Sequence, residues 1–154
     1  MKILRLFVVA LSLIVVLASC KKEETKTQKL CGKYWISTAI TIDPPILVNG
    51  TPVTDFYSQL TQCWKDDLQK FDANGVYTFD EGVSKCSIND PQTVLGTWSF
   101  NSGETIATVS WGGSNRSYTI MELSSTRLVA KYTELVDYGS GALNYTYTVT
   151  QVPH

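Results

Sequence analysis

Histidine is almost absent from this sequence, and its scarcity removes several kinds of chemistry from consideration. The single histidine is His154, at the C-terminal end. A serine or cysteine nucleophile normally needs a histidine base beside it, and zinc sites usually combine several cysteine and histidine ligands at close spacing. We therefore expect a protein that is not an enzyme and that holds no metal and no other cofactor.

Basic residues are also few in the part of the chain that follows residue 29. Residues 30–154 contain 7 lysines and arginines against 12 aspartates and glutamates, which gives this part a net charge of −5. A surface that binds nucleic acid needs clustered lysines and arginines. We therefore expect no nucleic-acid partner.

The apolar run near the N-terminus is short for a membrane span. It extends from Leu6 to Leu17, whereas a spanning helix needs about 20 residues. Lys2 and Arg5 precede it and small residues follow it, and this order is typical of a signal peptide. We expect residues 1–19 to be a signal peptide helix that is removed; an uncleaved anchor helix fits the pattern less well.

The four residues Leu17-Ala18-Ser19-Cys20 resemble the lipobox of bacterial lipoproteins. The resemblance implies cleavage before Cys20 and a lipid with fatty chains such as palmitate on its thiol. Each buried methylene contributes about 0.8 kcal/mol, so two or more chains anchor a protein stably. No aspartate follows Cys20 directly, which favours the outer membrane. Both its periplasmic face and the cell surface stay open as locations.

A polar segment separates this cysteine from the rest of the chain. Residues 21–29 contain no apolar side chain and cannot form a core. We expect residues 20–29 to be the lipidated cysteine and a flexible tether. The remaining residues, 30–154, are enough for one domain.

Short segments with alternating apolar and polar side chains dominate this domain. Such a period of two is typical of strands, and glycine- and asparagine-rich turns such as Asp72-Ala73-Asn74-Gly75 separate the segments. Residues Asp43 to Val53 and Val136 to Leu143 are interpreted as loops. The eight predicted strands are Lys33–Ile42, Leu68–Phe71, Val76–Asp80, Val94–Phe100, Thr105–Trp111, Ser117–Leu123, Arg127–Leu135 and Asn144–Val152.

Only one segment has the period of a helix. Its apolar residues between Phe56 and Trp64 form one stripe, and Thr54 is placed to cap it. We therefore expect one short α-helix after the first strand. Eight short, locally connected strands leave no unpaired edge when the sheet closes. The fold class is thus all-β, an eight-stranded antiparallel up-and-down β-barrel, with room for about one small ligand.

Several motifs are similar to those of the bacterial lipocalin-like domain found on small lipoproteins. These are Leu30-Cys31-Gly32-Lys33-Tyr34-Trp35, Cys63-Trp64-Lys65-Asp66-Asp67, Phe71-Asp72-Ala73-Asn74-Gly75-Val76-Tyr77, Asp80-Glu81-Gly82 with Lys85-Cys86, and Asp90-Pro91-Gln92 with Gly96-Thr97-Trp98. The resemblance implies a calycin-type barrel with an apolar pocket. It implies no particular ligand, because members of that family mostly lack an assigned activity.

Three cysteines remain once Cys20 carries the lipid. The family-like motif holds both Cys63 and Cys86, and this resemblance, with the hairpin between them, favours a disulfide that joins the two. Such a bond would stabilise the fold by roughly 3 kcal/mol. Cys31 is then interpreted as a small apolar residue of the first strand.

The acidic residues around the middle hairpin are the remaining alternative for a metal site. Asp66, Asp67, Asp72, Asp80 and Glu81 lie close in sequence, but they lack the spacing of a calcium-binding loop. Turn formation and solvation explain them at least as well.

Aromatic side chains on the strands are the best candidates for a binding site. In a small barrel they either fill a solid core or line a cavity. We expect a monomer that binds a small apolar or amphipathic ligand in the barrel; the alternative is a solid barrel whose loops bind a protein or glycan. The candidate pocket residues are Tyr34, Phe79, Trp98, Phe100, Tyr118, Tyr132, Tyr145 and Tyr147.

Overall fold

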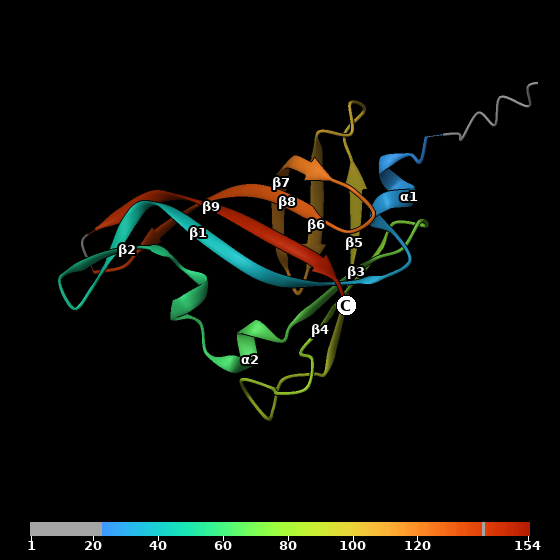
Figure 1. The fold of residues 1–154 in the computed structure, drawn as a ribbon. Coiled ribbons are helices and arrows are strands. Elements are labelled where there is room, and N and C mark those ends of the chain that lie inside the picture. Colours follow the sequence, from blue (N-terminus) through green and yellow to red (C-terminus); the bar gives the residue numbers. More distant parts are fainter. Residues whose placement is uncertain (1–22, 140) are drawn as a thin grey trace, which may run out of the picture.

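The computed structural model describes residues 23–139 and 141–154, which form one antiparallel sheet that closes on itself (Figure 1). The predicted signal peptide and Cys20, the predicted lipidation site, lie outside these residues. In chain order the elements are α1 (Lys26–Leu30), β1 (Tyr34–Val48), β2 (Thr51–Asp55), the 3₁₀ turn η1 (Tyr57–Gln59), α2 (Gln62–Lys65), β3 (Leu68–Phe71), β4 (Val76–Asp80), β5 (Thr93–Phe100), β6 (Ile106–Trp111), β7 (Ser114–Leu123), β8 (Leu128–Asp137) and β9 (Ala142–Pro153).

The first strand closes the barrel because it is long enough to use both of its edges. One edge of β1 pairs with β9, from Trp35 opposite Pro153 to Asp43 opposite Thr146. The other edge pairs first with β3 and then, further along, with β2. The strands β1 and β3 to β9 therefore form a closed eight-stranded up-and-down barrel, as predicted, and β2 is one extra strand.

The segment between residues 43 and 53 was predicted to be a loop, and this prediction is wrong. Strand β1 continues to Val48, and the chain returns as β2 after a tight turn. Asn49 and Gly50 make that turn with φ angles of 51° and 79°, which asparagine and glycine adopt most easily. The predicted loop between residues 136 and 143 is also shorter, because β8 and β9 extend into it.

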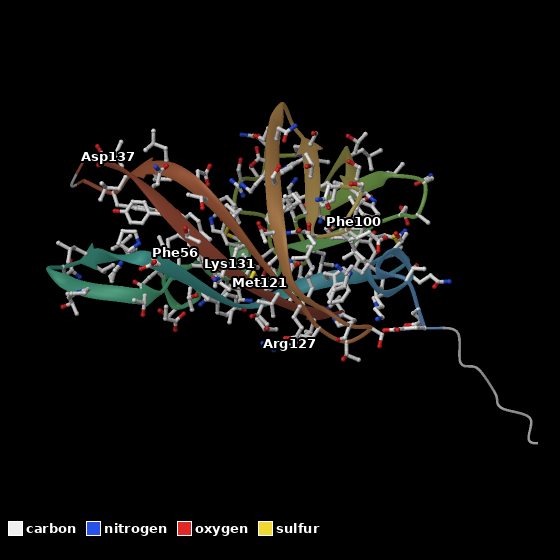
Figure 2. All side chains as sticks on the ribbon, turned by 90° about the horizontal axis from the view of Figure 1, so that it is seen from above. Phe56, Phe100, Met121, Arg127, Lys131 and Asp137 are labelled. Carbon is white, nitrogen blue, oxygen red and sulfur yellow. A yellow bond between two sulfur atoms is a disulfide. The ribbon has the colours of Figure 1, made fainter. Side chains whose placement is uncertain are left out.

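These extensions form an arm beside the barrel, consisting of residues 41–55, 132–137 and 142–147. Figure 1 shows β2 in this arm, away from β5 and β6, and Figure 2 shows Phe56 beside it and Asp137 at its tip. The buried residues Ile42, Ile46, Tyr145 and Tyr147 form its apolar core, which we call the arm cluster.

The predicted helix between Phe56 and Trp64 is present only in part. The structure has the 3₁₀ turn η1 followed by α2, which is four residues long, with extended backbone at Leu60 and Thr61. Asp55, and not Thr54, accepts the hydrogen bond from the first turn, at 3.1 Å from the Ser58 nitrogen. The apolar stripe is divided because Phe56 packs on the arm cluster whereas Trp64 lies near the barrel opening.

A short helix, α1, occupies the end of the segment that we expected to be a flexible tether. Thr25 and Gln28 form a reciprocal capping box at its start, with hydrogen bonds of 3.1 and 2.9 Å. Leu30 at its end is only 1% exposed. Cys31 follows α1 as its C-cap, before the first strand and not within it, and is half-buried.

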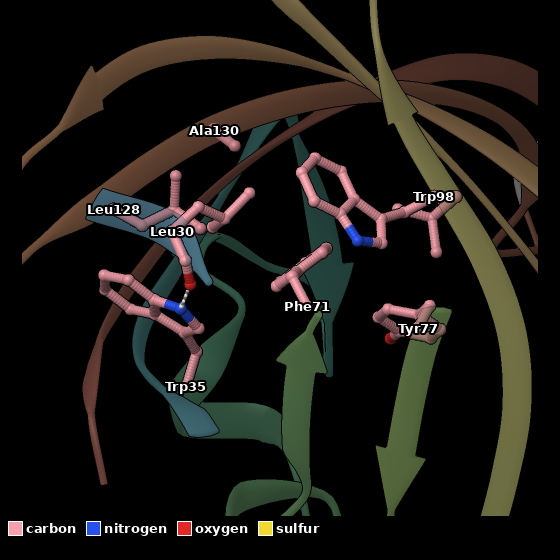
Figure 3. Close-up of a cluster of buried hydrophobic side chains, with 8 residues drawn as sticks. Leu30, Trp35, Phe71, Tyr77, Trp98, Leu128 and Ala130 are labelled. Carbon is pink, nitrogen blue, oxygen red and sulfur yellow. Dashed lines mark hydrogen bonds between the residues drawn. The ribbon is translucent and has the colours of Figure 1, made fainter. Parts of the chain in front are cut away.

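The barrel interior beside α1 is filled with apolar side chains that we call the Trp35 cluster. Trp35 is completely buried, and its indole nitrogen donates a hydrogen bond of 2.8 Å to the Leu30 carbonyl (Figure 3). This bond supplies the partner that a buried indole needs. The other members of the cluster are Leu30, Phe71, Tyr77, Trp98, Val109, Leu128 and Ala130. Within residues 23–139 and 141–154 no helix is long and apolar enough to cross a membrane.

Candidate ligand-binding cavity

The barrel encloses a cavity of about 650 Å³ that is partly open to solvent. Cavities of this size hold small organic ligands. Most of the lining side chains are apolar, and six are aromatic residues of β3, β4, β6, β7 and β8. These six are Phe71, Tyr77, Phe79, Trp111, Tyr118 and Tyr132.

Strand alternation explains which side chains reach the cavity. Every second residue of a strand points to the same face of a sheet. In the antiparallel pair of β6 and β7, Ala107 lies opposite Tyr118 and Val109 lies opposite Arg116. All four of these side chains line the cavity. Strand β8 contributes Leu128, Ala130 and Tyr132 in the same way.

Three of the eight predicted pocket residues, Phe79, Tyr118 and Tyr132, line the cavity. Trp98 and Phe100 are not among the lining residues. They stack edge-to-face with ring centroids 5.2 Å apart, and the Trp98 indole donates to the Asp72 carbonyl at 2.9 Å. Trp98 therefore belongs to the Trp35 cluster, and Phe100 packs against this cluster.

The other three predicted pocket residues lie in different surroundings. Tyr145 and Tyr147 are each 3% exposed and belong to the arm cluster. Tyr34 precedes the fully buried Trp35 on β1, so alternation directs it to the outer face of the sheet. Its ring lies beside Lys70, with 5.9 Å between the ammonium group and the ring centroid.

Sequence reasoning missed several lining residues that the same alternation could have found. Tyr77 is two residues from Phe79, and Arg116 is two residues from Tyr118. If Phe79 and Tyr118 face inward, their second neighbours must do so too. Arg116 is not aromatic, so the prediction of an aromatic pocket did not include it.

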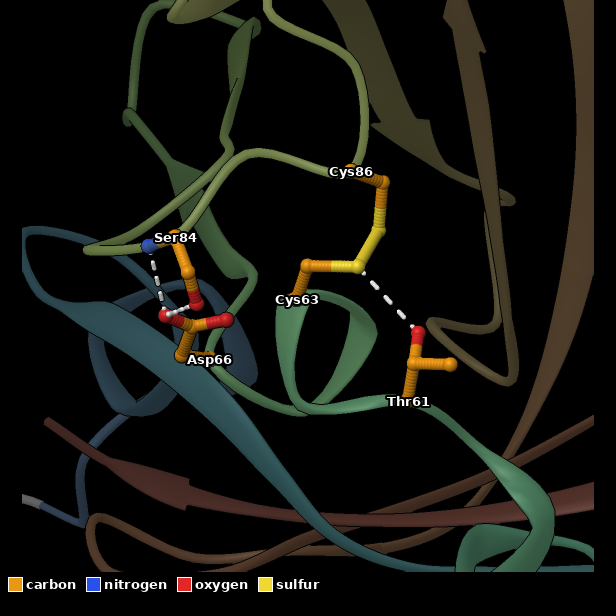
Figure 4. Close-up of a disulfide and its surroundings, with 5 residues drawn as sticks. All are labelled: Thr61, Cys63, Asp66, Ser84 and Cys86. Carbon is orange, nitrogen blue, oxygen red and sulfur yellow. Dashed lines mark hydrogen bonds between the residues drawn. A yellow bond between two sulfur atoms is a disulfide. The ribbon is translucent and has the colours of Figure 1, made fainter.

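The segment after the arm lies across part of the cavity opening. Leu60 and Trp64 line the cavity from this segment, and Trp64 remains 57% exposed. A disulfide between Cys63 and Cys86 joins α2 to the loop after β4, with 5.1 Å between the Cα atoms (Figure 4). This is the pairing that the family-like motif favoured.

Two further contacts hold the loop after β4 against α2. Asp66 Oδ2 accepts hydrogen bonds from the Ser84 nitrogen at 2.8 Å and the Ser84 hydroxyl at 2.6 Å (Figure 4). These bonds lower the pKa of the Asp66 carboxyl. Gly82 lies so close that a Cβ there would be 2.1 Å from the Asp66 carbonyl oxygen. The disulfide and these contacts therefore fix α2 and the loop after β4 to each other on this side of the opening.

Arg116 brings a charged group into the cavity wall, but its charge is already paired. Its Nη2 atom lies 3.1 and 3.0 Å from the two carboxylate oxygens of Glu134. The guanidinium also lies over the Tyr132 ring, 4.2 Å from the centroid, and 5.6 Å from that of Trp111. Burial raises the pKa of the Tyr118 hydroxyl nearby, and Arg116 opposes this rise. The phenol is thus neutral at physiological pH.

Asp67 is the second charged side chain in the cavity wall, and it has no comparable partner. It lies between α2 and β3, and among the described residues its Oδ1 atom is buried without a hydrogen-bond partner. Burial raises the pKa of this carboxyl to about 7, and the carboxylates of Glu81, Asp66 and Asp80 add to the rise.

The arrangement suits binding by burial and shape. The acidic residues do gather near Asp67, yet no group of three or more histidine, cysteine, aspartate or glutamate side chains in the described part of the chain is placed to hold a metal ion. An apolar wall with a few polar groups is typical of a site for a small organic molecule.

Comparison with known proteins assigns this barrel to a family. A family model described as a lipocalin-like domain matches residues 30–130, well over half of the chain. The chain therefore belongs to the lipocalin-like domain family. No curated protein sequence matches the chain.

Two solved structures of a bovine odorant-binding protein are similar to this chain. A deswapped triple mutant has 19% identity over 80% of this chain and 73% of its own, with a TM-score of 0.43. A complex with a selenium-containing odorant has 18% identity over 87% of this chain and 76% of its own, with a TM-score of 0.45.

Proposed function

We propose that this protein is an envelope-anchored lipoprotein that binds a small apolar or amphipathic ligand inside its barrel. The observation that carries the proposal is the cavity of about 650 Å³ with its aromatic wall. Burial of apolar ligand surface contributes roughly 25 cal/mol per Å² before the costs of association. Lipocalin-like proteins are typically binding proteins rather than enzymes, which agrees with this role.

The alternative from the sequence was a solid barrel that binds a protein or glycan through its loops. That alternative included a filled interior, whereas the barrel contains a cavity. Its two supposed binding loops are also largely the strands of the arm. Ligand binding in the barrel is therefore the better supported function.

The binding proposal is tested with a neutral fluorescent reporter, N-phenyl-1-naphthylamine, titrated into the purified domain. We expect saturable fluorescence enhancement in the wild type and its loss in Ile120→Trp, because Ile120 lines the cavity and an indole ring there occupies the space of the ligand. The variant should keep its stability within about 1.5 kcal/mol, because the added atoms enter empty space. Native mass spectrometry should detect a co-purified small molecule that Ile120→Trp lacks. Equal reporter binding by both proteins would contradict the proposal.

The anchoring proposal rests on the sequence around residue 20. Lipidation there would hold the domain at the outer membrane, on its periplasmic face or at the cell surface. Metabolic labelling with a palmitate analogue should mark the wild type and not Cys20→Ala. The variant should also leave the membrane fraction. Label on both proteins, or on neither, would contradict the proposal.

A further inference from the structure

The two charged side chains of the cavity wall differ in what they can still bind. Arg116 is engaged by Glu134, whereas Asp67 has a buried oxygen without a partner in the described part of the chain. We propose that the cavity selects ligands with an apolar body and a terminal amine, and that the amine is held by Asp67. This inference rests on the proposed function, because it concerns the same cavity.

Asp67 has the position of a polar contact at the edge of an apolar site. Its neighbours along the wall are Trp64 on one side in the chain and Gln69 on the other, and both line the cavity. A ligand that reaches Asp67 can therefore place its body against Phe71 and Phe79 of the adjoining strands. A carboxylate that lacks a partner in a partly buried site gains most from a charged hydrogen-bond donor.

The electrostatic surroundings favour a cation at this place. Asp66, Asp80 and Glu81 are near enough to influence the ionisation of Asp67, and all three are acidic. Their combined potential attracts a positive group and repels a negative one. Aromatic faces near an ammonium group add further attraction. A protonated amine therefore meets negative charge at this place, and its positive charge offsets that of the Asp67 carboxylate.

A carboxylate ligand, such as a fatty acid, meets the opposite situation. The cavity cation that it would need is Arg116, whose guanidinium donates to both oxygens of Glu134 and stacks on Tyr132. The ligand would have to displace Glu134 or leave its own charge unpaired. Specificity can come from such an unfavourable interaction with the wrong ligand as much as from an attractive interaction with the right one.

The test uses three ligands with the same ten-carbon chain and different ends. Decylamine, decanol and decanoate are each titrated to displace N-phenyl-1-naphthylamine from the wild type at pH 8. We expect decylamine to bind at least about tenfold more tightly than decanoate, with decanol between them, as one charge-assisted hydrogen bond allows. Asp67→Asn should remove most of the advantage of decylamine and leave decanol unchanged.

Glu81→Gln serves as the matched control, because it removes a nearby charge that does not line the cavity. We expect it to weaken decylamine by less than about threefold. Reporter and decanol binding without a preference for decylamine would overturn this inference while leaving the proposed function intact. So would a preference that survives Asp67→Asn. Failure of the reporter and of all three ligands to bind would overturn the proposed function, and this inference with it.

Discussion

The Trp35 cluster and the cavity share six residues of the same barrel, yet the side around Trp35 and Trp98 is packed and the other side is hollow. In the cluster, Phe71 meets Trp98 edge-to-face with centroids 5.5 Å apart, and Trp35 is completely buried. The cavity wall includes the small side chains Ala107 of β6 and Ala130 of β8. An eight-stranded barrel is about the size that side chains can just fill. The choice of large or small inward residues therefore decides where space remains.

The two regions also differ in how their polar groups are satisfied. The Trp35 and Trp98 indoles in or beside the cluster both donate to backbone carbonyls, at 2.8 and 2.9 Å. In the cavity wall, Asp67 keeps an oxygen that has no partner among the residues that the structure describes. A region built for stability pairs its polar groups internally, whereas a binding region leaves a group for its ligand.

The largest expected effect comes from breaking the packed region. Trp35→Ala removes a fully buried side chain and one hydrogen bond, and should lower the free energy of unfolding by about 3 to 5 kcal/mol. Urea denaturation followed by tryptophan fluorescence measures this loss. Tyr34→Ala, on the outer face of the same strand, is the control and should cost less than about 1.5 kcal/mol. Equal costs would contradict the assignment of Trp35 to the core.

Loss of the disulfide should lower the free energy of unfolding somewhat less than Trp35→Ala does. Its effect should fall chiefly on the segment between α2 and the loop after β4, at the cavity opening. Replacing both Cys63 and Cys86 with serine should lower the free energy of unfolding by roughly 3 kcal/mol, because the unfolded chain gains freedom. Cys31→Ser, at the half-buried free thiol, is the control and should lose less. Thermal unfolding compares the variants, and an unchanged midpoint in the double variant would argue against the bond.

The smallest expected effect is on how the free energy of unfolding depends on pH. It tests whether the carboxyl of Asp67 is less well satisfied than the polar groups of the Trp35 cluster. Its pKa rises from 3.8 to about 7 on folding, so the folded protein holds a proton that the unfolded chain releases in this range. The contribution of Asp67 to the free energy of unfolding therefore falls as pH rises from 4 to 7. Asp67→Asn removes this penalty and should be more stable than the wild type by about 1 kcal/mol at pH 8, after allowance for solvent screening.

At pH 4, where the folded carboxyl of Asp67 is protonated and that of the unfolded chain is only about half ionised, the Asn variant should lose most of this advantage. Urea denaturation at pH 4 and pH 8 gives the comparison. Asp90→Asn, at an exposed position, should show no such change with pH. An advantage of Asp67→Asn that is equal at the two pH values would show that the carboxyl titrates normally.

Much of the fold could be predicted because strand periodicity is a local property. The predicted bounds of β3 and β4 agree with the structure, and those of β5 to β9 differ by a few residues. The prediction missed β2 although Asn49-Gly50 is a strong turn signal. Pro44 and Pro45 precede this turn, and proline is uncommon within strands. Those prolines lie where the pairing register between β1 and β2 shifts, between Thr41 and Ile46, so the strand accommodates them.

The candidate site was less predictable than the fold. Phe79, Tyr118 and Tyr132 reach the cavity, but Tyr145 and Trp98, on equally regular strands, pack elsewhere. Alternation assigns a side chain to a face of the sheet and not to a height in the barrel. Height depends on the register between neighbouring strands, and local sequence does not contain it.

The sequence by itself determined eight of the strands, their period of two and the turns between most of them. Tertiary structure decided that β1 and β9 meet, that Tyr145 and Tyr147 pack in the arm cluster and not in the cavity wall, and that Asp67 lies in this wall with an oxygen unpaired among the described residues. The physical reason is that periodicity acts between neighbours in the chain. Packing, desolvation and charge act between residues that closure of the sheet brings together.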